Sequence, residues 1–228
     1  MACAERMVRP PIKETPFRGV FADSDKLFTR NLVPGRRVYG ERLCSLDDLE
    51  LREWVPRRSK LAAYLRHGGR FFPFREESRI LYLGAASGTT ASHLSDIAAR
   101  GTVYCVEIST RSFRDLVALC EVRRNMIPVL ADANRPDDYR FVVEGVDIVY
   151  QDVAQKNQAS IFLKNMIEFG AKAGMVAIKA RSEDVTMRPE DVFAAAEGFL
   201  RRSGMKVEDS LPLDPFEKDH AMIAVSMK

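Results

Sequence analysis

The chain has 228 residues, of which 46% are hydrophobic and 29% are charged, and its formal net charge is +3. This balance is typical of a soluble globular protein and excludes a disordered or highly charged chain. No apolar run reaches the ~18 residues that a spanning helix needs, so we expect no membrane partner.

Cysteine usage and the start of the chain predict a cytoplasmic protein. The opening stretch lacks the apolar segment of a secretory signal peptide. None of the four cysteines forms a CxxC pair or lies at ligand spacing from a histidine, so we expect no metal site. These cysteines are Cys3, Cys44, Cys105 and Cys120.

The first 54 residues differ in pattern from the rest of the chain. Between residues 17 and 43, short apolar groups are separated by Asp-Ser-Asp and Pro-Gly turn signals. This pattern predicts two or three β-hairpins. We therefore expect a small β domain over residues 1–54, with a structural or docking role, and a second domain over residues 55–228.

A basic stretch follows. From Arg52 to Arg79 there are eight Lys or Arg against three Glu, interleaved with aromatic residues. Such a segment is typical of a nucleic-acid face, although a solvated linker has the same composition. The candidate RNA contacts are Arg57, Arg58, Arg66 and Arg70.

From residue 79 the pattern alternates between apolar strands and helices. Strands are expected at 79–85, 102–108, 126–132, 146–153, 174–181, 206–213 and 220–227. Helices are expected at 89–100, 110–124, 136–143, 156–172 (closed by Gly174) and 189–202. This α/β alternation predicts a parallel sheet covered on both faces. The last two strands lack an intervening helix, so the seven-stranded sheet should end in an antiparallel pair, as in class I methyltransferases.

The turn after the first of these strands, Gly84 to Gly88, is made of very small residues. It lacks the Lys-Ser/Thr ending of a phosphate loop and the middle glycine of GxGxxG. A nucleoside ligand without phosphates, such as S-adenosylmethionine, fits this turn. Thr89 and Thr90 would then hold the methionine carboxylate at the helix start. A tight turn without a ligand is the alternative.

Acidic residues close the next strands. Glu107 is placed to bind ribose hydroxyls, Asp132 to accept from an adenine amino group, and Asp152 to lie centrally in the crevice. Each alone could be an exposed strand end. Lys179 lies inside an apolar strand, where a buried ammonium needs a partner, and Asp152 on the preceding strand is available. A purely structural pair is the alternative.

Several stretches resemble the fibrillarin family, in its short archaeal form. They are WVPRRSKLAAYL (54–65), YLGAASGTTASHLSDI (82–97), VEISTRSFRDL (106–116), ADANRPDDY (131–139), DVAQKNQA (152–159), IKARSEDVT (178–186) and PFEKDHAM (215–222). The resemblance implies a small N-terminal β domain, a class I methyltransferase domain and RNA ribose 2′-O-methylation within box C/D ribonucleoproteins, on pre-rRNA or tRNA.

The resemblance also implies roles for particular residues. The implied cofactor contacts, together with the turn residues Gly84 and Ala86, are Thr89, Thr90, Glu107, Ile108, Asp132, Ala133, Asp152, Val153, Ala154 and Gln155. The implied catalytic set is Lys60, Asp152, Lys179 and His220. A ribose hydroxyl is a poor acid, so the protein must align it and help remove its proton. Two nearby ammonium groups lower each other's pKa, which would free one amine as the base.

The implied partners are a box C/D guide RNA, its target RNA, a coiled-coil Nop-domain scaffold protein and a kink-turn-binding protein of ribosomal type. The Gly/Arg-rich segment of nucleolar fibrillarins is absent, so nucleolar targeting is not expected. Two other functions stay open: a non-catalytic ribonucleoprotein subunit that keeps the fold, and an NAD-dependent oxidoreductase.

Overall fold

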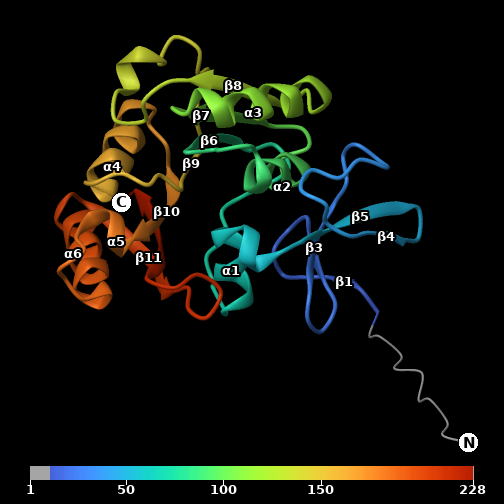
Figure 1. Ribbon diagram of the computed structural model, residues 1–228, viewed down its shortest axis with the longest axis horizontal. Coiled ribbons are helices and arrows are strands. Elements are labelled where there is room, and N and C mark those ends of the chain that lie inside the picture. Colours follow the sequence, from blue (N-terminus) through green and yellow to red (C-terminus); the bar gives the residue numbers. More distant parts are fainter. Residues whose placement is uncertain (1–10, 228) are drawn as a thin grey trace, which may run out of the picture.

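The computed structural model describes residues 11–227, so Cys3 and the first ten residues of the expected β domain lie outside the described part (Figure 1). Two sheets lie on either side of α1 (Lys60–Arg66). The smaller sheet contains β1 (Lys13–Glu14), β2 (Val20–Ala22), β3 (Leu27–Arg30), β4 (Leu43–Leu46) and β5 (Leu49–Trp54). Its strands are all antiparallel, in the order β1-β2-β3-β5-β4, which confirms the expected hairpins.

The larger sheet has seven strands in the order β11-β12-β10-β9-β6-β7-β8. They are β6 (Arg79–Leu83), β7 (Thr102–Glu107), β8 (Met126–Leu130), β9 (Ile148–Gln151), β10 (Ala173–Lys179), β11 (Met205–Pro212) and β12 (His220–Met227). The neighbouring strands β10, β9, β6, β7 and β8 are parallel to one another. Strand β12 lies between β10 and β11 and is antiparallel to both. The sequence prediction of a parallel sheet that ends in an antiparallel pair is confirmed.

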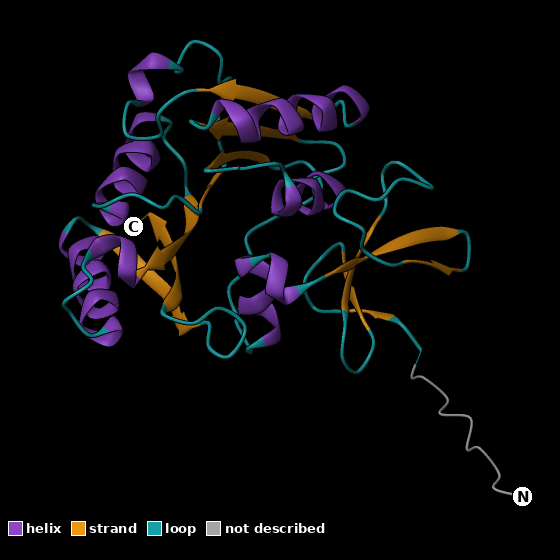
Figure 2. Cartoon of the chain, viewed as in Figure 1, coloured by secondary structure: helices purple, strands orange, loops and turns teal. Residues whose placement is uncertain are grey.

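Helices cover both faces of this sheet (Figure 2). They are α2 (Thr89–Ile97), α3 (Thr110–Val122), α4 (Gln158–Glu168), α5 (Ala180–Glu183) and α6 (Pro189–Arg202), with short 3₁₀ helices η1 (Pro56–Arg58) and η2 (Pro136–Asp138). Neighbouring residues of β6 belong to different hydrophobic clusters: Ile80 and Tyr82 to one, Leu81 and Leu83 to the other. Two buried faces explain why the parallel strands are apolar throughout.

Three details differ from the sequence predictions. Helix α1, which was not predicted, lies within the basic stretch of residues 52–79, and its residues Leu61 to Leu65 are buried. The helix expected at 136–143 is only the single turn η2. Helix α4 ends at Glu168 and is followed by Gly170 in the left-handed region. Gly174 instead lies within β10, where a Cβ would come within 2.6 Å of the Phe162 ring.

A buried polar network joins the smaller sheet to α2. The Arg52 guanidinium in β5 is fully buried and forms ion pairs with Glu41 and with Asp96 of α2. Arg123 adds a second ion pair to Asp96, at 2.6 Å. His93 of α2 stacks on Trp54, with 5.0 Å between ring centroids. Because buried charges are costly unless paired, this network fixes the sheet firmly against α2.

Candidate active site

Three charged side chains meet at the carboxyl edge of the larger sheet. Asp152 directly follows β9, Lys179 ends β10 and Lys60 begins α1. Lys179 Nζ lies 2.9 Å from Asp152 Oδ1, and Lys60 Nζ lies 3.2 Å from Oδ2. The ion pair predicted between Lys179 and Asp152 is confirmed, and Lys60 joins it from 92 residues away in the sequence.

The charge of this cluster follows from its surroundings. Burial acts to raise the pKa of Asp152, but the two ammonium groups outweigh it, and the pKa lies below its usual value. Asp152 is therefore a carboxylate at neutral pH. Its charge balances only one of the two ammonium groups, and the remaining positive charge would stabilise an oxygen that is losing its proton. Lys179 and Lys60 each contact one carboxylate oxygen of Asp152, and since each such oxygen can accept more than one hydrogen bond, the carboxylate keeps acceptor capacity for a further donor.

His220 lies at the same edge. It begins β12, and its register partner in β10 is Lys179. Its Nδ1 lies 2.6 Å from the carbonyl oxygen of Lys218. This hydrogen bond assigns the proton to Nδ1 and leaves the Nε2 lone pair free. Burial, followed by the nearby Lys60 and Lys179 charges, lowers the pKa of His220 below 6.5, so the ring is neutral at pH 7.

A cavity of about 270 Å³ opens beside this cluster. Nine of the residues predicted to bind the cofactor line it: Gly84, Ala86, Glu107, Ile108, Ala133, Asp152, Val153, Ala154 and Gln155. Val106, Ala131 and Lys179 complete the wall. Small and apolar side chains together with two carboxylates, those of Glu107 and Asp152, suit a nucleoside, and the exposed Ile108 offers an apolar surface for a base.

Three predicted cofactor residues do not line this cavity. Thr90 is buried, and its hydroxyl donates to Ser59 Oγ at 2.9 Å. Thr89 lines a separate cleft, beside Ser87. The Asp132 carboxylate accepts the Asn134 backbone N–H at 2.9 Å. Their cofactor roles stay predictions, because strand-end position alone does not determine which way a side chain points.

The turn of small residues after β6 packs closely against neighbouring parts of the same chain. Gly84 has φ +80, and a Cβ there would come within 2.6 Å of the Asp152 carbonyl oxygen. The Ala86 N–H donates to Glu107 Oε2 at 2.8 Å, and the Ser109 N–H donates to Oε1 at 2.7 Å. Glu107 thus holds the turn in place. Each carboxylate oxygen can accept a further hydrogen bond, which leaves acceptors for two ribose hydroxyls.

The sequence interpretation missed Gln158, the first residue of α4. Its buried amide accepts the Lys179 N–H at 2.9 Å and donates to the Lys179 carbonyl at 3.1 Å. Gln151 Nε2 in turn donates to the Gln158 carbonyl at 2.8 Å. A glutamine that bonds both polar groups of one backbone residue fixes where that residue lies. The signal available in the sequence was the position of Gln158 within the stretch DVAQKNQA (152–159), which carries part of the family resemblance.

The four arginines proposed for RNA binding fall into two places. Arg57 and Arg58 lie in η1, directly before Ser59 and Lys60. Arg66 ends α1, and the exposed Arg70 lies 3.7 Å from Asp209. Only the first pair adjoins the catalytic cluster.

Other site types are absent from the described part of the chain. Residues 11–227 contain no group of three His, Cys, Asp or Glu side chains arranged to hold a metal ion. The helices within those residues are too short or too polar to span a membrane.

Comparison with known proteins decides the family. The fibrillarin family model matches residues 12–228. The chain belongs to the fibrillarin family. A fibrillarin-like rRNA/tRNA 2′-O-methyltransferase from Methanopyrus kandleri is 49% identical over 214 residues, which cover 92% of each chain.

Two solved fibrillarin structures are similar over nearly the whole chain. Fibrillarin from Aeropyrum pernix, with natively bound S-adenosyl-L-methionine, is 46% identical with a TM-score of 0.86, covering 95% of this chain and 98% of that one. Fibrillarin in a complex with Nop5p is 41% identical with a TM-score of 0.86, covering 95% and 100%. The fibrillarin fold, including its small N-terminal sheet, is therefore shared.

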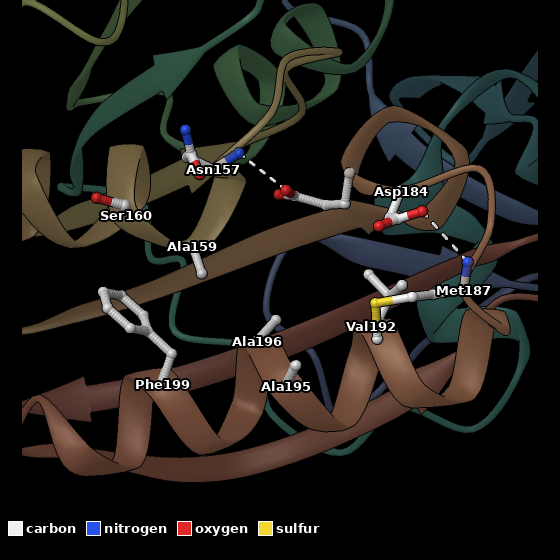
Figure 3. Close-up of a pocket in the computed structure, with 10 residues that line it drawn as sticks. Asn157, Ala159, Ser160, Asp184, Met187, Val192, Ala195, Ala196 and Phe199 are labelled. Atoms are coloured by element: carbon white, nitrogen blue, oxygen red, sulfur yellow. Dashed lines mark hydrogen bonds between the residues drawn. The ribbon is translucent and has the colours of Figure 1, made fainter.

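This member of the fibrillarin family has a second, more apolar hollow, between α4 and α6 (Figure 3). Met187, Val192 and Phe199 line it together with alanines, and Glu183 accepts backbone N–H groups at the start of α4. None of Lys60, Asp152, Lys179 or His220 lines this hollow. It is distinct from the candidate active site.

Proposed function

We propose that the chain is an S-adenosylmethionine-dependent RNA ribose 2′-O-methyltransferase. The observation that carries this proposal is the Lys60–Asp152–Lys179 cluster, of which Asp152 and Lys179 also line the nucleoside-sized cavity. Cofactor and hydroxyl would meet at this point. Membership of the fibrillarin family supports the same reaction.

The cofactor would be held by the cavity's own residues. Glu107 accepts from the ribose hydroxyls, the Gly84–Ala86 turn leaves room for the nucleoside, and Ile108 contacts the base. When bound, S-adenosylmethionine supplies an activated methyl group. Because the methyl donor is already activated, the protein's main task is to hold the acceptor oxygen in line with it.

The catalytic residues act on the target hydroxyl. The Asp152 carboxylate, which can accept a hydrogen bond beyond its two lysine contacts, would accept from the 2′-OH and orient its oxygen. The Lys60 and Lys179 charges stabilise the oxygen as its proton leaves. The proton would be accepted by His220 Nε2, and the oxygen's lone pair would form the bond to the methyl carbon as the bond between that carbon and the cofactor's sulfonium sulfur breaks.

The proposed assembly is a guide-RNA particle. A coiled-coil Nop-domain scaffold protein is the proposed protein partner, and the solved complex of a 41% identical fibrillarin with Nop5p supports it. We also propose a box C/D guide RNA, its target RNA and a kink-turn-binding protein as partners. A cytoplasmic location stays a proposal, supported by the free cysteines Cys44, Cys105 and Cys120.

The decisive experiment measures transfer of a labelled methyl group from S-adenosylmethionine to a target RNA, with and without guide RNA and partner proteins. The proposal predicts a 2′-O-methylated ribose at the guided position only in the complete particle. A particle that binds target RNA but transfers no methyl group would instead support the non-catalytic subunit. Binding of NAD in place of S-adenosylmethionine would support the oxidoreductase.

A further inference from the structure

A cleft of about 410 Å³ lies at the N-terminal end of α2. One wall is the 33–39 segment between β3 and β4, with Arg36 and Arg37, and the opposite wall is α3. Arg58 and Thr89 also line it. The cleft therefore joins the smaller sheet to the turn that lines the cofactor cavity.

The charge of the cleft is strongly positive. Arg36, Arg37 and Arg58 are exposed, and none forms an ion pair with any residue between 11 and 227. Arg58 lies 5.8 Å from the Tyr39 ring centroid, and Arg37 Nε donates to the Glu41 carbonyl. Asp115 is the one acidic residue in the described lining. Three guanidinium groups thus face solvent with most of their donors free.

The other end of α2 provides an internal comparison. A hollow of about 440 Å³ there contains Arg18, Arg30 and Arg100. Its acidic residues are Glu14, Glu76, Glu77 and Asp96, and Arg100 forms ion pairs with Glu76 and Glu77. Two hollows of similar size therefore differ in charge, and the excess of arginine occurs only at the end of α2 beside the active site.

We propose that the basic cleft binds the phosphodiester backbone of the RNA strand whose ribose is methylated. Arg58 is two residues from the catalytic Lys60, and Ser59 between them bonds to Thr90 at the start of α2. A strand that places its 2′-hydroxyl at Asp152 passes this segment and reaches Arg36 and Arg37. The planar guanidinium group matches phosphate geometry, and phosphate contacts fix the register of a strand without reading its sequence.

This inference rests on the proposed function and assigns a role to the N-terminal sheet. The sheet is more than a structural module, because its β3–β4 connection supplies two of the three solvent-facing arginines in the cleft; the fourth lining arginine, Arg123, is buried and paired with Asp96. The RNA path then runs from Arg58 across the smaller sheet, away from Arg66 and Arg70 at the far end of α1.

The test compares two double variants of the full chain. Arg36→Ala/Arg37→Ala removes two cleft charges. The control Arg18→Ala/Arg30→Ala removes two exposed charges near the opposite end of α2 that form no ion pair within residues 11–227. Both variants lower the net charge equally. A labelled guide–target RNA duplex is titrated at a series of KCl concentrations. The slope of log affinity against log KCl concentration should become shallower in the cleft variant, by about 0.7–0.9 for each phosphate contact removed. The control should keep the wild-type slope.

If both variants lost the same amount of salt dependence, the effect would come from net charge alone, and the proposal would be overturned. A cleft variant that keeps the wild-type salt dependence of RNA binding would also overturn the proposal. This includes a cleft variant that loses only its binding to the Nop-domain protein. Arg36→Glu, at an exposed side chain that forms no ion pair within residues 11–227, repeats the test if the double variant is unstable. Methyl transfer by the wild-type particle is measured in parallel: its absence would contradict the proposed function, whereas the salt slopes test the cleft alone.

Discussion

Lys179 and His220 are direct register partners, at the last residue of β10 and the first residue of β12. Residues opposite each other in an antiparallel pair project their side chains to the same face of the sheet. The imidazole therefore lies beside Lys179, at the edge of the sheet where Lys179 pairs with Asp152. The terminal antiparallel pair, which distinguishes this sheet from a wholly parallel one, carries the fourth catalytic candidate to the edge where the other three meet.

The first prediction follows from the charge around His220. Burial, followed by the Lys60 and Lys179 charges, lowers its pKa, so NMR titration of the ring should give a midpoint below 6.5. Lys60→Ala should raise this midpoint, because one repelling charge is lost. The chain has three histidines, so the signals can be assigned by substitution. A midpoint that does not move in Lys60→Ala would show that the two side chains do not interact.

The same shift predicts a pH effect on the reaction. As pH falls through the lowered pKa of His220, the ring gains a proton and its Nε2 can no longer accept one. Methyl transfer should therefore decline on the acid side, below pH 6.5, and His220→Asn should flatten this limb. An unchanged acid limb in the His220→Asn particle would remove His220 from the proton path.

The second prediction concerns cofactor binding. Glu107→Ala should weaken S-adenosylmethionine binding by about 1.5–3 kcal/mol, because the ribose loses a charged acceptor and the turn loses its anchor. Glu121→Ala is the control, since it removes an exposed carboxylate of α3 that does not line the cavity, and it should leave the affinity unchanged. Calorimetry of both variants measures the difference. Equal affinities in Glu107→Ala and Glu121→Ala would contradict the assignment of Glu107.

The third prediction concerns the buried network between the sheet and α2. Asp96→Ala leaves the buried Arg52 and Arg123 guanidinium groups without their shared carboxylate. The free energy of unfolding should fall by about 3–5 kcal/mol, as measured by urea denaturation. Asp147→Ala breaks a surface pair with Arg79 instead, and should cost at most about 1 kcal/mol. Similar losses in both variants would contradict the structural importance of the network.

The elements that the sequence predicted best are those with strong periodicity. All seven strands of the larger sheet and the pairing of Lys179 with Asp152 follow from apolar runs and the charged residues at their ends. The contact of Lys60 with Asp152 joins residues far apart in the chain, and only the family resemblance brought them together. Helix α1 was not predicted because its apolar segment is short and is flanked by basic residues on both sides, so it shows no clear helical periodicity.

The network around Arg52 could not be predicted from sequence. Arg52, Glu41 and Asp96 have no periodic pattern that sets them apart from solvated surface charges, and their burial depends on how the smaller sheet meets α2. Thr89 and Thr90 lie at the start of α2, as predicted from sequence. The Thr90 hydroxyl donates to Ser59 and Thr89 lines the neighbouring cleft, so their roles toward the cofactor stay predictions.

The fourth prediction concerns Gln158, a positioning residue. Gln158→Ala removes both amide bonds to the Lys179 backbone, so the ammonium group should lose its fixed position against Asp152. We expect a fall in kcat of about 10-fold or more, with little change in the KM for S-adenosylmethionine. Gln158→Glu keeps the length of the side chain but loses the amide donor, and should give an intermediate rate. Equal changes in kcat and KM would point to a general structural defect instead.

The central claim is that the Lys60–Asp152–Lys179 cluster performs methyl transfer. The most direct measurement is the single-turnover rate of labelled methyl transfer to the guided nucleotide, in assembled particles containing wild-type chain or Lys179→Ala. The account predicts a loss of about 10²–10⁴-fold in Lys179→Ala, with S-adenosylmethionine binding and particle assembly retained. A Lys179→Ala particle that methylates its target at the wild-type rate would show that this lysine is structural and would contradict the mechanism.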